Sequence, residues 1–238
     1  MCSRGRSTIK YRIIYFPPSI NMNIEQARFN MIEQQIRPWN VLDQDILDLL
    51  FVVKREQFVP AAYQNLAFAD IEIPLPGGQA MFAPKFEARI LQELGLKKHE
   101  TVLEIGTGSG YMAALLAHRG AKVTSVEINE ENKTFAQKNL TRAGIGNVTV
   151  ELGNGAEGWA KGAPFDVIVI SGALEVLPDE ILKQVKVRGR IAAIVGQPPV
   201  MEACIITRTG ENSYNTVKVF ETNMQYLVGA PVPSHFTF

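Results

Sequence analysis

The sequence predicts an α/β fold, namely a doubly wound, mostly parallel sheet with an N-terminal helical extension and a C-terminal antiparallel hairpin. After Lys98, short apolar runs alternate with helical patterns, as they do in a parallel sheet whose two faces are covered. A glycine-rich turn joins the first of these runs to its helix, at the place where doubly wound sheets bind ligands. The last two runs, within residues 202–222, are separated by the turn Gly210-Glu211-Asn212, a spacing typical of a hairpin.

Two helices are expected at the start of the N-terminal extension. Apolar residues recur at helical spacing from Asn23 to Ile36, and Pro38 ends the pattern. Asp43 is a suitable N-cap for a second helix over residues 44–54.

A loop and a third helix follow. Residues 61–79 contain two prolines and a pair of glycines, and are expected to form an extended loop. Pro84 suits the first turn of a helix that runs through Leu94, and Gly95 is its expected C-cap.

The alternating region then supplies the sheet and the helices that cover it. Its buried or alternating apolar runs predict strands at residues 101–105, 122–128, 147–153, 165–173 and 190–196. Helices are expected between them at residues 109–119, 129–144 and 179–185. The boundaries that we expect are a helical and substrate-loop region over 22–98 and a ligand-binding α/β region over 99–238, folded together as one unit.

The composition disfavours several classes of function. Lys plus Arg and Asp plus Glu both number 24, so the net charge is zero and a nucleic acid is not an expected partner. The three histidines lack metal-ligand spacing, and no metal site is expected. Cys2 and Cys204 are isolated in the sequence, as expected of free thiols in a reducing compartment, and no run is long enough to span a membrane. We therefore expect a cytoplasmic protein, a monomer or weak dimer.

Residues 1–21 differ from the rest of the chain, because they carry four basic residues, no acid and a Pro-Pro break. A targeting peptide has such a composition. Since Met22 opens a clean helical pattern, a misassigned start or a disordered arm is the favoured interpretation.

The strongest motif is the run Glu104-Ile-Gly106-Thr-Gly108-Ser-Gly110-Tyr111. A dinucleotide fingerprint would need its third glycine at position 111, which is tyrosine. An acid two residues before the first glycine would repel a pyrophosphate but suits a cationic amino group. S-adenosylmethionine carries such an ammonium beside its sulfonium. Glu127, at the end of the second strand, can accept hydrogen bonds from both ribose hydroxyls. These residues predict an S-adenosylmethionine site.

The residues after the fourth strand bear on the methyl acceptor. They read Ser171-Gly-Ala-Leu, and they lack both the Asn- or Asp-Pro-Pro-aromatic run of base-nitrogen methyltransferases and a cysteine nucleophile. Methylation of a nucleobase is therefore disfavoured. Ser171 lies at a strand end that should face the cleft.

The chain from about residue 25 to 200 resembles the protein-L-isoaspartate O-methyltransferases, which are class I methyltransferases with a Rossmann-like fold. The resemblance rests on "REQFVP" at residues 55–60, "PLPGGQ" at residues 74–79, the glycine motif, and "APFDVIVISGA" at residues 163–173. It implies carboxyl methylation of L-isoaspartyl residues in damaged proteins or peptides, with S-adenosylhomocysteine as the second product. A carboxylate is already ionised at neutral pH, so alignment and removal of water suffice, and no catalytic residue is assigned.

The motif and the resemblance together give a set of expected site residues. Those expected to bind the cofactor are Gln79, Glu104, Gly106, Thr107, Gly108, Gly110, Glu127, Ile128, Asn154 and Gly155. Those expected to border the acceptor are Gly78, Ala80, Met81, Phe82 and Ser171.

The sequence departs from the family pattern in several places. Where the family has Gly-Gln-Thr-Ile-Ser-x-Pro, this chain has Ala80 for the threonine and Phe82 for the serine, so both hydroxyls are missing. Asn154 replaces an aspartate that would accept from the adenine amino group, Arg188 stands where the family usually has glycine, and the ending after Tyr226 differs. Two alternatives therefore stay open, namely a methyltransferase of the same lineage with a more apolar acceptor, and a cofactor-binding module without turnover.

Overall fold

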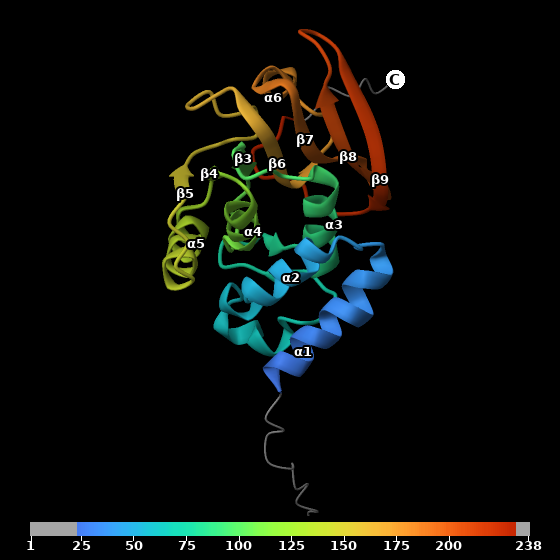
Figure 1. Cartoon of the computed structure of the whole chain (residues 1–238). Helices are drawn as coiled ribbons and strands as arrows, with labels where there is room; N and C mark the ends of the chain where they lie inside the picture. The colour runs from blue at the N-terminus through green and yellow to red at the C-terminus, as the bar shows by residue number, and fades with distance from the viewer. Residues whose placement is uncertain (1–22, 232–238) are drawn as a thin grey trace, which may run out of the picture.

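The computed structural model describes residues 23–231 and shows a single large sheet flanked by helices (Figure 1). The large sheet contains seven strands in the order β5-β4-β3-β6-β7-β8-β9, and a separate two-stranded sheet pairs β1 with β2. The strands are β1 (Ile73–Pro74), β2 (Ala80–Met81), β3 (Thr101–Ile105), β4 (Lys122–Glu127), β5 (Val148–Leu152), β6 (Phe165–Leu174), β7 (Val185–Gln197), β8 (Val200–Arg208) and β9 (Tyr214–Thr222).

The α-helices are α1 (Ile24–Asn30), α2 (Gln44–Val52), α3 (Pro84–Leu94), α4 (Tyr111–Arg119), α5 (Glu130–Arg142) and α6 (Asp179–Lys183). A π-helical turn η1 (Met31–Ile36) and the 3₁₀ turns η2 (Arg37–Trp39), η3 (Arg55–Gln57) and η4 (Ala61–Leu66) complete the helical elements described.

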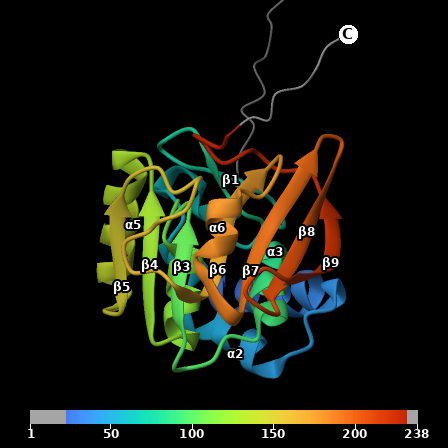
Figure 2. The same cartoon turned by 90° about the horizontal axis from the view of Figure 1, so that it is seen from above.

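The sheet has the predicted arrangement. Strands β3 to β7 pair in parallel, whereas β8 and β9 are antiparallel and form one edge. In Figure 2, α3 and α5 lie behind the sheet and α6 lies in front of it. The doubly wound fold with a C-terminal hairpin is therefore confirmed.

Local sequence signals account for several of the element ends. The side chain of Asp43 accepts the N–H of Asp45 and caps α2, and Gly95 ends α3 with a left-handed backbone (φ 53°), both as predicted. The first helix is less regular than its pattern suggests, because it changes to η1 at Met31 before η2 ends it.

Two segments differ from the sequence-based expectation. Residues 61–79 are not an extended loop throughout, because they contain η4 and strand β1. Strand β7 begins at Val185, ahead of the predicted 190–196, and includes Arg188 at φ 68°. A glycine would adopt this backbone without strain, so the Arg188 departure from the family pattern has a conformational cost.

The apolar core lies on both faces of the sheet. One buried cluster joins the N-terminal helices to α3, α4 and the sheet, with Ile36, Leu50, Leu91 and Leu115 all 0–1% exposed. A second cluster, on the opposite face, packs strands β3, β6 and β7 against α6 and is partly covered by Trp159 and Leu227. The C-terminal segment that follows β9 therefore lies beside β6, where Leu227 N–H donates to Ala173 O and Ala173 N–H donates to Gln225 O.

Candidate cofactor and acceptor site

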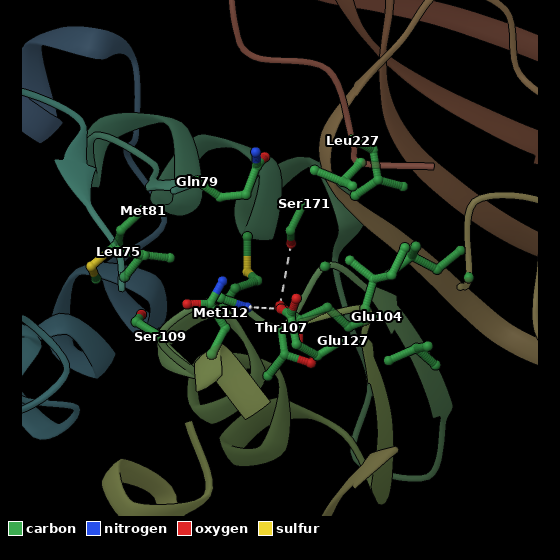
Figure 3. Close-up of a pocket in the computed structure, with 18 of the residues that line it drawn as sticks. Leu75, Gln79, Met81, Glu104, Thr107, Ser109, Met112, Glu127, Ser171 and Leu227 are labelled. Carbon is green, nitrogen blue, oxygen red and sulfur yellow. Dashed lines mark hydrogen bonds between the residues drawn. The ribbon is translucent and has the colours of Figure 1, made fainter. Parts of the chain in front are cut away.

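A cavity with about 700 Å³ of empty space, counting the part that is open to solvent, lies at the carboxyl ends of β3, β4 and β6 (Figure 3). The chain leaves β3 for β4 on one side and returns to β6 on the other, so this is the topological switch point of the sheet. The cavity is lined by Leu75, Gln79, Ala80, Met81, Phe82, Glu87, Glu104, Ile105, Gly106, Thr107, Gly108, Ser109, Met112, Val126, Glu127, Ile128, Asn132, Gly153, Asn154, Gly155, Ser171, Leu227 and Val228.

The glycine turn forms the floor of the cavity. Gly106, Gly108 and Gly110 have φ values of 93°, 53° and 82°, which residues with a Cβ rarely adopt. A Cβ on Gly106 would lie 3.1 Å from the carbonyl oxygen of Ser171, and one on Gly108 would lie 3.0 Å from the Leu75 side chain. The glycines therefore keep the turn low and leave room above it.

Glu104 is fully buried beneath the cavity, and its carboxyl group is hydrogen-bonded to a network of serine and threonine hydroxyls. Its Oε2 accepts from Ser125 Oγ at 2.5 Å, and its Oε1 accepts from Ser171 Oγ at 3.2 Å, as Figure 3 shows for Ser171. Thr107 Oγ1 lies 2.6 Å from Ser125 Oγ and continues the network. Burial raises the pKa of Glu104 to about 8, although both serine hydroxyls oppose the rise.

Glu127 is held rigidly at the end of β4. Its Oε2 accepts the backbone N–H of Gly108 at 2.8 Å, and its Oε1 accepts the N–H of Asn129 at 3.0 Å. The two carboxylates, Glu104 and Glu127, are thus placed at the cavity by neighbouring strands of the sheet. Each oxygen retains a lone pair for a ligand that donates hydrogen bonds.

Comparison with known proteins agrees with this geometry. The family model for protein-L-isoaspartate(D-aspartate) O-methyltransferase matches residues 26–227. The chain belongs to this family. It is similar to protein-L-isoaspartate O-methyltransferase 2 of Pelobacter propionicus, with 35% identity over 93% of this chain and 99% of the relative. It is also similar to the Koribacter versatilis protein-L-isoaspartate O-methyltransferase, with 34% identity over 90% of this chain and 95% of the relative.

A solved structure supports the fold. It is that of a putative protein-L-isoaspartate O-methyltransferase from Plasmodium falciparum, described as a complex with S-adenosyl-L-homocysteine. The two structures superpose with a TM-score of 0.73 at 17% identity, over 86% of this chain and 98% of the other. The family resemblance that the motifs predicted is confirmed.

Most of the predicted site residues of this family member line the cavity, but two do not. Gly110 lies below it as the N-cap of α4, where an added Cβ would meet Ala136 and Leu140 at 3.3 Å. It lets α4 and α5 pack closely, and the cofactor contact predicted for it stays a prediction. Gly78, which is predicted to border the acceptor, is also absent from the lining, because at φ 80° it lies in the turn between β1 and β2.

The acceptor loop of the family is a short hairpin here. Strands β1 and β2 pair Ile73 with Met81, and the turn between them closes with Leu75 N–H donating to Gln79 O at 2.7 Å. A smaller hollow of about 240 Å³ adjoins the main cavity and is lined by Glu72, Gln79, Ala80, Phe82, Ser171, Met224 and Gln225. The two spaces share Gln79, Ala80, Phe82 and Ser171, so these four residues lie between them.

Phe82 is only 8% exposed and borders both spaces. Phe82 therefore belongs to the buried core cluster at the edge of the site and is not exposed to solvent. Its carbonyl oxygen accepts from Arg55 Nη2 at 2.6 Å, and this bond fixes the end of the hairpin.

Arg55 and Glu87 form a buried ion pair under the hairpin. Arg55 is 0% exposed, contacts the Glu87 carboxylate through Nη1, and donates to the carbonyl of Ala67 at 3.1 Å. Burial raises the pKa of Glu87 to about 7, while the Arg55 guanidinium opposes the rise. Sequence analysis used Arg55 only as part of a family motif and missed Glu87, which lines the cavity and lies 32 residues away in the chain.

Asn154 does not have a free amide oxygen. Its Oδ1 accepts the backbone N–H of Ala156 at 2.9 Å, and its Nδ2 donates to Gly229 O at 3.3 Å. The expected role as an adenine acceptor therefore depends on the second lone pair of that oxygen. The C-terminal Leu227 and Val228, also missed by sequence analysis, reach the cavity only through the return of the chain past β6.

Within residues 23–231, the acidic, histidine and cysteine side chains form no group of three that could hold a metal ion. No helix in the same range is both long and apolar enough to cross a membrane.

Proposed function

We propose that this protein methylates the free carboxylate of L-isoaspartyl residues in proteins or peptides, using S-adenosylmethionine and releasing S-adenosylhomocysteine. The observation that carries the proposal is the pairing of two spaces at the switch point, a large one lined by the carboxyl groups of Glu87, Glu104 and Glu127, and a small one beside it. Family membership supports the same assignment.

The lining of the large cavity fits S-adenosylmethionine. Glu104, near the end of β3 just before the glycine turn, would receive the cofactor ammonium. Glu127 would accept from the ribose hydroxyls, and Ile128, Leu227 and Val228 would supply apolar contact to the adenine. A Cβ at Gly155 would meet Ile105 at 3.0 Å and Val126 at 3.3 Å, so this glycine also keeps the cavity open.

When bound, S-adenosylmethionine supplies an electrophilic methyl group on a sulfonium. The protein has to exclude water and align an incoming carboxylate, because that carboxylate is already ionised near neutral pH and needs no base. Among the described residues that line the two spaces there is no lysine, arginine or histidine. Positioning alone can lower a barrier by roughly 7–11 kcal/mol, so this sparse lining is sufficient for the reaction.

Ser171 is suited to position the acceptor. It borders both spaces, and its Oγ lies 3.2 Å from Glu104 Oε1, to which it donates. The Gln79 amide, on the hairpin, is the other polar side chain shared by the two spaces. These two groups would take the place of the hydroxyls that positions 80 and 82 lack.

A second candidate function is methylation of a more apolar acceptor by the same cofactor. The observation that favours it is that the apolar residues Ala80 and Phe82, which replace the family hydroxyls, line both spaces. The cofactor site would be unchanged in this case.

The test mixes the full chain and S-adenosylmethionine with two peptides that differ only in containing an isoaspartyl or a normal aspartyl residue. Mass spectrometry measures the methyl ester, and S-adenosylhomocysteine is counted as the other product. Ester on the isoaspartyl peptide alone supports the proposal. Its absence, in protein shown by calorimetry to bind S-adenosylhomocysteine, refutes the isoaspartyl assignment and leaves the second candidate.

A further inference from the structure

Asn132, in the first turn of α5, has an enclosed side chain with a fixed orientation. It is 1% exposed, and its Oδ1 accepts the backbone N–H of Gly77 at 2.9 Å. Only the oxygen of an amide side chain can accept a hydrogen bond. The contact with Gly77 therefore determines which end of the amide is oxygen and which is nitrogen.

The amide nitrogen of Asn132 has no hydrogen-bond partner among the described residues, although it is buried. An unsatisfied buried donor is unfavourable, and buried polar groups in folded proteins nearly always have a partner. Asn132 lines the large cavity together with Glu127, so the missing partner can be an atom of a ligand held there.

The neighbouring groups show what kind of atom is needed. A ribose hydroxyl has one proton to donate and two lone pairs that accept. The Glu127 carboxylate can only accept, and the nearby backbone N–H groups of Gly108 and Asn129 already donate to it. Asn132 lines the same cavity as Glu127, and its Nδ2 is a donor that has no hydrogen-bond partner within the described part of the chain.

We propose that Asn132 is a cofactor-binding residue whose Nδ2 donates to a hydroxyl oxygen of the ribose that Glu127 binds. The proposal rests on the cofactor site proposed above and adds a residue that the glycine motif does not contain. Glu127 then accepts hydrogen bonds from the two ribose hydroxyls, while Asn132 Nδ2 donates a hydrogen bond to the oxygen of one of them.

The same amide also connects the ribose to the acceptor hairpin. Gly77, which Asn132 holds by its N–H, lies in the turn before Gln79 and Ala80, and these two residues border both spaces. A Cβ on Gly77 would lie 2.7 Å from Asn132 Nδ2, so the turn is seated directly on this side chain. Occupation of the ribose site therefore steadies the hairpin on which the acceptor is aligned.

The test measures binding by calorimetry for three ligands, namely S-adenosylhomocysteine and its 2′-deoxy and 3′-deoxy analogues. The proteins are the wild type, Asn132→Leu and a control, Asn147→Leu. Asn147 precedes β5, and its Nδ2 donates to Ala117 O at 2.9 Å, so the control also removes a hydrogen-bonded amide, but one that does not line the cavity. In Asn132→Leu the affinity for S-adenosylhomocysteine should fall about three- to tenfold, the worth of one hydrogen bond. The affinity penalty for removing one of the two hydroxyls should shrink by the same factor, and the control should match the wild type.

Equal weakening of all three ligands in Asn132→Leu would mean that the side chain acts only through Gly77, and would overturn the proposal. Unchanged affinity would overturn it as well. If thermal unfolding shows that Asn132→Leu is not folded, Asn132→Ser, whose side chain is too short to make both contacts, takes its place with the same expectations. Failure of the wild type to bind S-adenosylhomocysteine is a separate result that refutes the proposed cofactor site itself.

Discussion

Glu104 should make cofactor binding depend on pH. Burial is the main cause that raises the pKa of this carboxyl to about 8; the hydrogen bonds from Ser125 and Ser171 oppose the rise, and the negative charges of Glu127 and Glu87 add to it. Below pH 8 the empty protein therefore holds a proton on Glu104. A ligand ammonium favours the charged carboxylate and lowers this pKa, so binding releases the proton and affinity falls as the pH drops below 8.

The size of the effect follows from the raised pKa. With a pKa of about 8 in the empty site, roughly nine-tenths of the molecules carry the proton at pH 7, and each further pH unit costs about 1.4 kcal/mol, or about tenfold in affinity. Between pH 7.5 and pH 6.0 the affinity for S-adenosylhomocysteine should therefore fall about 20- to 30-fold. Close to one proton should be released for each ligand bound at pH 6.5.

Calorimetry at one pH in phosphate and in Tris measures this release, because the two buffers take up protons with different enthalpies. Glu87 also lines the cavity, and its pKa is raised to about 7. Variants are therefore needed to show which of the two carboxyl groups releases the proton when the ligand binds. Glu104→Gln should bind more weakly at pH 7.5 and lose the slope between pH 7.5 and 6.0, whereas Glu127→Gln should keep it. A wild-type affinity that is flat over this range, with no proton released, would refute the reasoning.

Three further predictions concern neighbouring residues. Glu127→Ala should weaken cofactor binding by about 10- to 100-fold, since hydrogen bonds to a charged group are worth about 1.5–3 kcal/mol, and unchanged affinity by calorimetry would contradict the assignment. Phe82→Ser restores a hydroxyl of the family pattern and should raise kcat/KM on an isoaspartyl peptide by about tenfold. The same change should lower the free energy of unfolding by on the order of 3 kcal/mol, because it removes a buried ring. A fall in kcat/KM would show that the ring contributes to the reaction. Arg55→Met should cost about 3–5 kcal/mol in urea unfolding, because it leaves Glu87 buried without its cation, and the double variant with Glu87→Leu should recover part of that loss; an unchanged midpoint would mean that the pair is not needed for stability.

The sequence by itself determined those features that depend on residues close together in the chain. The helix caps at Asp43 and Gly95 could be predicted because capping involves only residues of the adjoining turn. Glu104 and the glycines after it lie in one continuous turn, so their place at the end of β3 follows from the strand and helix on either side. The same locality explains why most of the predicted cofactor residues do line the cavity.

Tertiary structure alone decided the features that join distant segments. Gly110 belongs to the same motif, yet its contacts are with α5, and only packing shows that it supports the helices and does not touch the cavity. The carbonyl of Phe82 accepts from Arg55, 27 residues earlier in the chain, and the amide of Asn132 accepts from Gly77, 55 residues earlier. Such contacts have no periodic signal in the sequence, because they arise where folded elements meet. The physical reason is that local propensity acts over a few residues, whereas the lining of this site is assembled by the sheet from segments between Leu75 and Val228.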